Sequence, residues 1–182
     1  MDTMAGLKRT HYCGEVEGVG NTVVVGGYVQ KIRDMGTLIF IDLRDRTGIV
    51  QLAFDETTAR EVFEKASECH SEYVLMAKGT VRERESKNDT IKTGNIEIFV
   101  DDLRILAKAQ TPPFEVTDKT NVNEELRLKY RYLDLRRKPL QDNIIMRSKL
   151  AKSARDYFYE NGFIEIETPM MIKPTPEGAR DY

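Results

Sequence analysis

Apolar and polar positions alternate from Thr37 to Phe54, which predicts two β-strands joined by a tight polar turn. The turn would be Asp45-Arg46-Thr47-Gly48, because its residues suit a turn and Gly48 can take a positive φ. The apolar residues that would share the core face of this hairpin are Ile39, Ile41, Leu43, Val50, Leu52 and Phe54. The stretch therefore predicts one buried face and one open face.

Phe40 lies on the predicted open face among polar neighbours, and Gln51 can share that face from the paired strand. An aromatic ring beside an amide on an open sheet is one way in which proteins hold unstacked nucleic-acid bases. The alternative is that a loop covers Phe40 or that the ring is simply exposed, as single apolar residues often are. The hairpin alone does not choose between these interpretations.

The flanking stretches extend this hairpin into a larger β-structure. The paired glycines Gly26 and Gly27, inside an otherwise strong strand pattern, predict a bulge or a sharp coil. Asp55 is a plausible N-cap for a helix. The elements expected around the hairpin are a bending strand over 21–33, a helix over 56–66 and strands over 73–85 and 95–106. This order matches the OB-fold, a five-stranded Greek-key barrel.

Further polar side chains could reach the surface that carries Phe40 and Gln51. Arg33 ends the first strand, Arg82 lies on the fourth, and Glu97 points away from the apolar face of the fifth. Arginines contact phosphates or base edges, and a carboxylate can accept a hydrogen bond from a base. Each of these residues taken singly is an ordinary surface charge, so the nucleic-acid hypothesis depends on their sharing one face.

The pattern changes at Thr111-Pro112-Pro113, which predicts a domain boundary. Residues 123–138 have a basic helical pattern, either a solvated face or a contact for an RNA backbone. A second helix follows, opened by Pro139 and stopped by Asn161-Gly162, and residues 163–167 alternate as a short strand. The expected domains are 1–108, a linker and hinge over 109–138, and 139–182.

Composition narrows the class of protein without naming it. The 182 residues carry a net charge of −2, so a nucleic-acid site would need a local basic patch. Cys13 and Cys69 are not spaced as metal ligands, and His11 and His70 have no partners at the spacing of a metal site or a catalytic triad, so we expect no metal site. Two unpaired thiols also indicate a reducing compartment, and we expect the protein in the cytoplasm. The chain contains no apolar run near 18 residues, and its first residues lack a signal-peptide core.

Four stretches resemble a known family. The helix followed by Gly162-Phe163-Ile164-Glu165-Ile166-Glu167-Thr168-Pro169 closely resembles motif 1 of class II aminoacyl-tRNA synthetases, which builds the homodimer interface in that family. The run Lys129-Tyr130-Arg131-Tyr132-Leu133-Asp134-Leu135-Arg136-Arg137 resembles the hinge of the aspartate, asparagine and lysine subgroup. The stretches 40–51 and 175–182 are similar to those of bacterial-type aspartyl-tRNA synthetases.

The resemblance implies a mainly β chain with helices: a five-stranded OB-fold barrel, a helical hinge, and the first helix and strand of a class II α+β catalytic domain. The parent enzyme would activate aspartate with ATP and Mg²⁺ and transfer it to tRNA(Asp). Motifs 2 and 3, which hold ATP in the family, are not among these residues, so we expect an N-terminal fragment without catalytic residues or activity. The implied partners are the tRNA(Asp) anticodon stem-loop and a second copy, with neither DNA nor a membrane.

The resemblance also implies roles for single residues. Phe40 matches a ring that stacks on an anticodon base, and Gln51 matches the side chain that recognises the middle base. Arg33 and Glu97 match residues near the first base. The remaining matches are Arg82 and Asn88 near the third base, Glu177 at the amino group of bound aspartate, and Gly162 and Pro169 in the motif 1 dimer interface.

Three alternatives stay open at this point. The chain could come from a lysyl- or asparaginyl-tRNA synthetase, although residues 177–181 argue against this. It could be a free-standing OB-fold module for single-stranded nucleic acid, or its second half could be a purely structural dimerising helix. The sequence also leaves open whether the parent enzyme charges tRNA(Asn) as well as tRNA(Asp).

Overall fold

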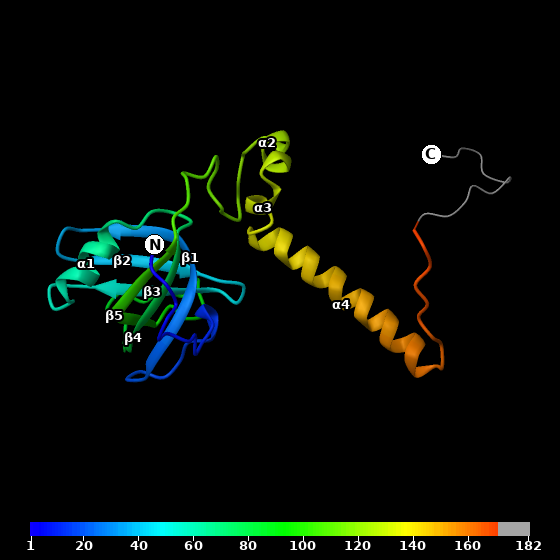
Figure 1. The fold of residues 1–182 in the computed structure, drawn as a ribbon, viewed down its shortest axis with the longest axis horizontal. Helices are drawn as coiled ribbons and strands as arrows, with labels where there is room; N and C mark the ends of the chain where they lie inside the picture. Colours follow the sequence, from blue (N-terminus) through cyan, green and yellow to red (C-terminus); the bar gives the residue numbers. More distant parts are fainter. Residues whose placement is uncertain (171–182) are drawn as a thin grey trace. The chain divides into compact units, whose positions relative to one another are not determined.

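The computed structural model describes residues 1–170 and divides the chain into two compact units, Met1–Glu115 and Val116–Tyr182. The first unit is a closed barrel with the strand order β1-β2-β3-β5-β4 (Figure 1). Its strands are β1 (Thr22–Asp34), β2 (Ile39–Arg44), β3 (Ile49–Phe54), β4 (Val74–Glu83) and β5 (Ile96–Ala107). Neighbouring strands pair antiparallel except β3 and β5, whose parallel pairing closes the barrel. The predicted OB-fold layout is confirmed.

Alternation of side chains builds the barrel core, as the sequence predicts. Every apolar residue assigned to the core face of the β2–β3 hairpin is fully buried. The turn closes with a hydrogen bond from the backbone N–H of Asp45 to the carbonyl of Gly48, whose φ is +151°. The other face is less open than predicted: Gln51 shares it with Phe40 but is buried, because the side chains of Arg33 and Glu97 hydrogen-bond to it.

The first strand serves two partners. Residues 22–28 of β1 pair with β4 and residues 28–34 pair with β2. Gly27 lies at the crossover, where a Cβ atom would stand 2.4 Å from the carbonyl oxygen of Arg44, so only glycine permits this approach. The shift in register falls between Val29 and Lys31, so the predicted irregularity exists but lies beyond the two glycines.

The helix of the barrel, α1 (Arg60–Ser67), begins later than predicted, and Asp55 does not cap it. The Oδ1 atom of Asp55 instead accepts hydrogen bonds from the backbone N–H and the hydroxyl of Thr57, at 2.8 and 2.6 Å. Aspartate side chains favour such local turns, which compete with helix capping. This turn delays the helix and leaves the Oδ2 atom of Asp55 for another partner.

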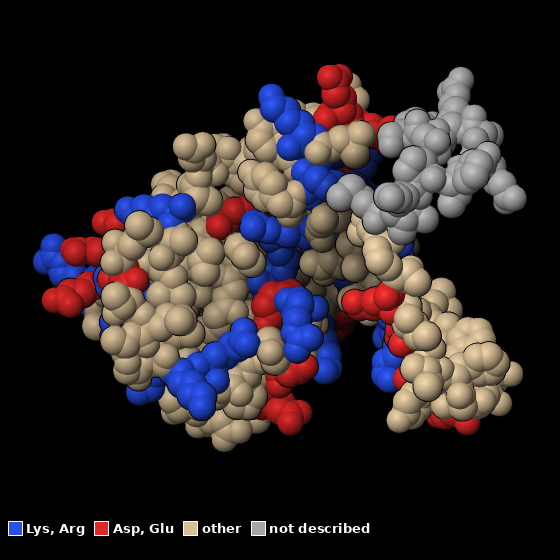
Figure 2. Space-filling model, turned by 45° about the vertical axis from the view of Figure 1, so that its right-hand side comes forward, with Lys and Arg blue, Asp and Glu red and all other residues tan. Residues whose placement is uncertain are grey.

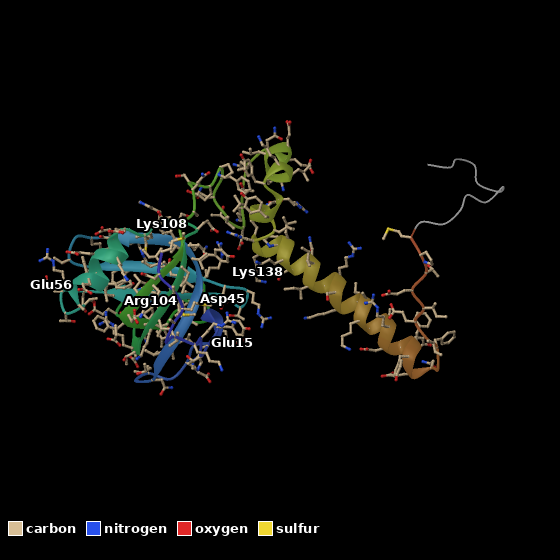
Figure 3. The ribbon with its side chains drawn as sticks, in the orientation of Figure 1. Glu15, Asp45, Glu56, Arg104, Lys108 and Lys138 are labelled. Atoms are coloured by element: carbon tan, nitrogen blue, oxygen red, sulfur yellow. The ribbon has the colours of Figure 1, made fainter. Side chains whose placement is uncertain are left out.

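The residues before β1 form part of the barrel. A short 3₁₀ helix, η1 (Cys13–Glu15), lies against the β2–β3 turn, and Figure 3 labels Glu15 and Asp45 on these two segments. The backbone N–H of Cys13 donates to Asp45 Oδ2 at 2.8 Å, and that of Gly14 donates to Thr47 Oγ1 at 2.9 Å. These contacts attach the N-terminal segment to the far end of the hairpin.

In the second unit, the helix predicted over 123–138 is two short helices, α2 (Glu124–Lys129) and α3 (Arg131–Asp134). The break falls at Tyr130, whose φ of −111° and ψ of 48° are not helical. Asp134 is fully buried, and its carboxylate pairs with Arg131 at 2.7 Å, Arg137 at 2.8 Å and Arg127 at 3.6 Å. Three basic side chains of this stretch therefore surround one carboxylate.

The long helix α4 (Lys138–Glu160) ends as predicted, at Asn161 and at Gly162 with a φ of +82°. Residues 163–167 do not form the predicted strand, because no strand of this unit lies beside them within the described residues to share backbone hydrogen bonds. Ile164 is 84% exposed, and no residue of α4 is buried. None of the helices described up to residue 170 is both long and apolar enough to cross a membrane.

Candidate nucleic-acid interface

A cleft of about 570 Å³ opens on the barrel where β1, β3 and β4 end and β2 and β5 begin. Five of the six residues predicted to bind an anticodon line it: Arg33, Phe40, Gln51, Arg82 and Glu97. Asn88, the sixth, is not in the lining and instead accepts hydrogen bonds from Thr90 within its own loop. The other lining residues are Met35, Leu38, Asp55, Glu83, Arg84, Glu85 and Ser86.

Strand register places the polar side chains of the cleft in one row across four strands. Asp42 of β2 is opposite Gln51 of β3, Gln51 is beside Glu97 of β5, and Glu97 is opposite Arg82 of β4. Paired residues of neighbouring strands point to the same face. The row is therefore a consequence of how the strands pair, and it brings together residues that are up to 55 positions apart in the sequence.

These side chains form a continuous chain of hydrogen bonds. Arg33 Nη2 donates to Gln51 Oε1 at 2.7 Å, and Gln51 Nε2 donates to Glu97 Oε2 at 2.6 Å. Arg82 Nε donates to the other oxygen of Glu97, Oε1, at 2.7 Å. Gln51 and Glu97 are only 4% and 5% exposed, so each is held by its neighbours with little access to water.

Two carboxylates hold the ends of this chain, and the sequence analysis missed both. Arg33 pairs with Asp42 at 3.2 Å, and Arg82 pairs with Asp55 at 3.4 Å. A hydrogen bond from the Thr57 hydroxyl, helped by the Arg82 guanidinium, lowers the pKa of Asp55. The alternation of β2 places Asp42 on the same face as Phe40, but nothing in the sequence pairs Asp55 with Arg82.

Aromatic rings lie beside both arginines. The guanidinium carbon of Arg33 is 5.6 Å from the centre of the half-buried Phe40 ring, and that of Arg82 is 4.7 Å from the centre of the Phe99 ring. Such contacts orient a guanidinium while leaving its remaining N–H groups free to donate. Phe40 therefore forms a wall of the cleft, with Leu38 and Met35 next to it.

Two arginines that line the cleft carry an N–H group without a hydrogen-bond partner in the described part of the chain. Arg33 Nε and Arg84 Nε are buried without a hydrogen-bond partner among residues 1–170, and Arg84 is only 8% exposed. A buried donor without a partner destabilises the free protein, and a ligand acceptor would remove that cost. Figure 2 shows Lys and Arg interleaved with Asp and Glu on the visible surface of the barrel.

The resemblance also implies roles for three residues outside the barrel. Gly162 ends α4, and Pro169 lies in the irregular segment that follows it. Glu177 lies outside the described residues. Among the residues that are described, no group of three or more His, Cys, Asp or Glu side chains could hold a metal ion.

Comparison with protein families assigns both parts of the chain. Residues 23–106 match the family of OB-fold nucleic acid binding domains, and residues 123–182 match class II tRNA synthetases of the D, K and N group. The barrel is thus similar to a nucleic-acid binding domain, and the helical unit is similar to part of a class II tRNA synthetase of this group.

Individual relatives narrow the class. The chain is 57% identical over its whole length to an aspartate–tRNA(Asp/Asn) ligase from Caldanaerobacter subterraneus and 52% identical to an aspartate–tRNA ligase from Ruminiclostridium cellulolyticum. It covers 31% of each, so it spans about a third of the length of these relatives. An asparaginyl-tRNA synthetase structure from Pyrococcus horikoshii superposes with a TM-score of 0.77 at 26% identity, covering 95% of this chain and 39% of the other. By sequence, the chain is similar to about a third of an aspartate–tRNA ligase.

Proposed function

We propose that this chain is the tRNA-binding part of an aspartate–tRNA ligase. In this proposal residues 1–108 bind the anticodon, residues 109–138 are the linker and hinge, and residues 139–182 begin the catalytic domain. The full-length enzyme would activate aspartate with ATP and Mg²⁺ and transfer it to tRNA(Asp). The observation that carries the proposal is the row of hydrogen-bonded side chains in the barrel cleft, with Phe40 as a wall of the same cleft.

The cleft suits unstacked bases rather than a duplex. Phe40 offers a half-exposed ring for stacking, and base stacking on an aromatic side chain contributes about 1–3 kcal/mol. Gln51 offers an amide for the middle base, while Arg33 and Glu97 flank it near the first base. Arg82 would contact the third base, with Asn88 approaching from its loop when RNA is bound.

The proposal also covers the assembly and the cellular context. Apolar side chains along α4, such as Ile144, Leu150 and Phe158, are more than half exposed in the described part of the chain. Exposed apolar residues in this number favour an interface, and we propose that α4 and the segment through Pro169 form the homodimer contact in the full-length enzyme. We place that enzyme in the cytoplasm, and we propose that Glu177 holds the amino group of aspartate.

The test is binding of the 182-residue chain to a tRNA(Asp) anticodon stem-loop at fixed moderate salt. The anticodon GUC is compared with single-base changes at each position. We expect a loss of about 1–3 kcal/mol for a wrong base, as is typical of base-edge recognition. Equal, weak and strongly salt-dependent binding to every stem-loop would overturn the proposal.

A pair of arginine variants sharpens this test. Arg82→Ala removes a guanidinium from the cleft, whereas Arg104→Ala removes one from β5 that pairs with Asp102 outside the cleft lining (Figure 3). We expect Arg82→Ala to weaken binding and to reduce selectivity at the third position. Arg104→Ala should do neither, and equal effects of the two variants would indicate general electrostatic attraction.

A second candidate substrate is tRNA(Asn), because the relative at 57% identity is named for both tRNAs. The aspartate anticodon GUC and the asparagine anticodon GUU differ only in the third base. Binding of the two stem-loops with equal affinity would favour an enzyme that uses both tRNAs. A clear preference for GUC would favour an enzyme that uses only tRNA(Asp).

A further inference from the structure

Two arginines meet on one tyrosine ring at the turn between β2 and β3. The guanidinium carbon of Arg9 lies 4.1 Å from the centre of the Tyr12 ring, and that of Arg46 lies 4.5 Å from the same centre. Arg9 and Tyr12 lie in the segment just before η1, whereas Arg46 belongs to the turn itself. We call these three residues the arginine–tyrosine stack.

Both arginines of the stack lack a carboxylate partner. Arg9 and Arg46 are exposed, and neither forms an ion pair within the described residues. Asp45, next to Arg46, accepts hydrogen bonds from Thr47 and from the backbone of η1 instead, and Glu15 attracts Arg46 without forming an ion pair. Five other arginines of the barrel do pair with a carboxylate: Arg33, Arg44, Arg60, Arg82 and Arg104.

A guanidinium that lies over a ring keeps its own edge available. The contact uses the flat face of the cation, while its N–H donors point outward in the plane of the group. This planar fork matches the geometry of a phosphate, which can accept two parallel hydrogen bonds from it. Packing on the ring also restricts the side chain before any ligand arrives, so less conformational entropy is lost on binding. The stack therefore presents two oriented sets of donors to an anion.

The stack and the cleft lie at opposite ends of the β2–β3 hairpin. Phe40, a wall of the cleft, is near the start of β2, whereas Arg46 comes after the end of this strand, and neither Arg9 nor Arg46 lines the cleft. At about 3.3 Å per residue, Phe40 and Arg46 are roughly 20 Å apart along the hairpin. Base pairs of duplex DNA rise about 3.4 Å each, so a nucleic-acid stem of roughly six base pairs has this length.

We propose that Arg9 and Arg46, held by Tyr12, bind backbone phosphates of the anticodon stem while the anticodon loop occupies the cleft. This inference rests on the proposed anticodon-binding function. Phosphate contacts fix the position of a nucleic acid but carry no sequence information. The stack therefore adds affinity for every stem-loop to the same extent, and the choice among anticodons stays with the cleft.

The first experiment measures how the affinity of the 182-residue chain for a tRNA(Asp) anticodon stem-loop depends on salt. The variants are Arg9→Ala, Arg46→Ala and the double variant. Arg104→Ala is the matched control, because it removes the same charge from another barrel arginine outside the cleft lining. We expect each single variant to weaken binding by about two- to tenfold and to lower the slope of log affinity against log salt by about one. Arg104→Ala should leave that slope unchanged.

A second experiment locates the contact on the RNA. Methylphosphonate linkages remove the charge of one phosphate at a time, in the stem or in the loop. A neutral linkage at a contacted stem phosphate should weaken binding to the unmodified chain but have no further effect on Arg46→Ala, because both changes remove the same interaction. Coupling of Arg46→Ala to loop linkages alone, or to no linkage, would overturn the inference.

Tyr12 has a positioning role in this proposal, and two variants test it. Tyr12→Phe keeps the ring and should bind like the unmodified chain. Tyr12→Leu removes the ring and should weaken stem-loops with GUC and with altered anticodons by the same factor, at an unchanged melting temperature. A loss that differs among anticodons would contradict a phosphate contact.

Failure of the inference can be told apart from failure of the proposed function. If the unmodified chain binds GUC and altered anticodons equally, the anticodon-binding function itself fails. If the chain selects GUC but Arg9→Ala and Arg46→Ala change neither affinity nor salt slope, only the stem contact is refuted. In that case the two arginines are available to an acidic protein surface rather than to RNA.

Discussion

The buried carboxylate of Asp134 offers a sharp test of how the helical unit is held together. Asp134→Asn keeps the shape of the side chain but removes its charge. Three guanidinium groups, those of Arg127, Arg131 and Arg137, then lose their shared counter-charge. Because Arg137 also donates to the carbonyls of Thr117 and Asp118, the linker before α2 should loosen together with α3.

The size of the effect follows from the exposure of each arginine. The Arg137 side chain is 10% exposed, and leaving such a buried charge without a counter-charge costs about 3–5 kcal/mol. Arg131 is 47% exposed, so its pair contributes about 1 kcal/mol at most, and Arg127 is farther away at 3.6 Å. We expect local opening of the unit to become easier by about 3 kcal/mol, which corresponds to roughly a 100-fold rise in the opened population.

Limited digestion with trypsin measures that population, because cleavage after Arg127, Arg131 or Arg136 requires local opening. Mass spectrometry identifies the cleaved bonds, and rates are compared at low protease concentration. Asp142→Asn is the control, since Asp142 pairs with Lys138 on an exposed surface of α4 and should change cleavage less than about threefold. Equal cleavage rates in the two variants would refute the role assigned to the buried carboxylate.

Three further predictions follow from the barrel. Phe40→Ala should weaken every anticodon stem-loop by about 1–3 kcal/mol with little change in melting temperature, and a loss confined to one base would contradict stacking. Burial raises the pKa of the Cys69 thiol to about 12 and raises that of Cys13 further, so both should react slowly with Ellman's reagent at pH 8 until urea unfolds the chain; fast labelling of the folded chain would contradict this. The pKa of Asp2 is lowered by the backbone N–H of Ile105 and by Lys65, so its stabilisation is complete above the ordinary value of 3.8 and is lost as pH falls through the folded value. The free energy of unfolding, measured with urea, should therefore fall below about pH 4, and Asp2→Asn should reduce that pH dependence.

Local patterns predicted most of the barrel correctly. The alternation around Ile39 and Val50 identified the core face, because the period of a strand determines which side chains share a face. Gly48 and Gly162 marked a turn and a helix end, since a positive φ is accessible to glycine at little cost. The order of the elements was sufficient to predict the OB-fold layout.

Predictions failed where a residue can form more than one local structure, or where its structure depends on contacts with residues far away in the sequence. Asp55 could cap a helix or close a turn, and only the fold brought Arg82 to its second oxygen. The helix predicted over 123–138 breaks at Tyr130, where Asp134 gathers arginines from both sides of the break. Residues 163–167 have a strand pattern but lack a neighbouring strand in the described chain, so the pattern alone cannot form backbone pairs.

The sequence by itself determined which face of each barrel strand a side chain occupies, because side-chain alternation is a local property. It indicated Arg33, Phe40, Gln51, Arg82 and Glu97 before any contact was known. Only the tertiary structure decided that four strands align Asp42, Gln51, Glu97 and Arg82 in one row, since strand register depends on pairing between distant segments. That alignment buries the Gln51 amide between a donor, Arg33, and an acceptor, Glu97, which no local pattern in the sequence could show.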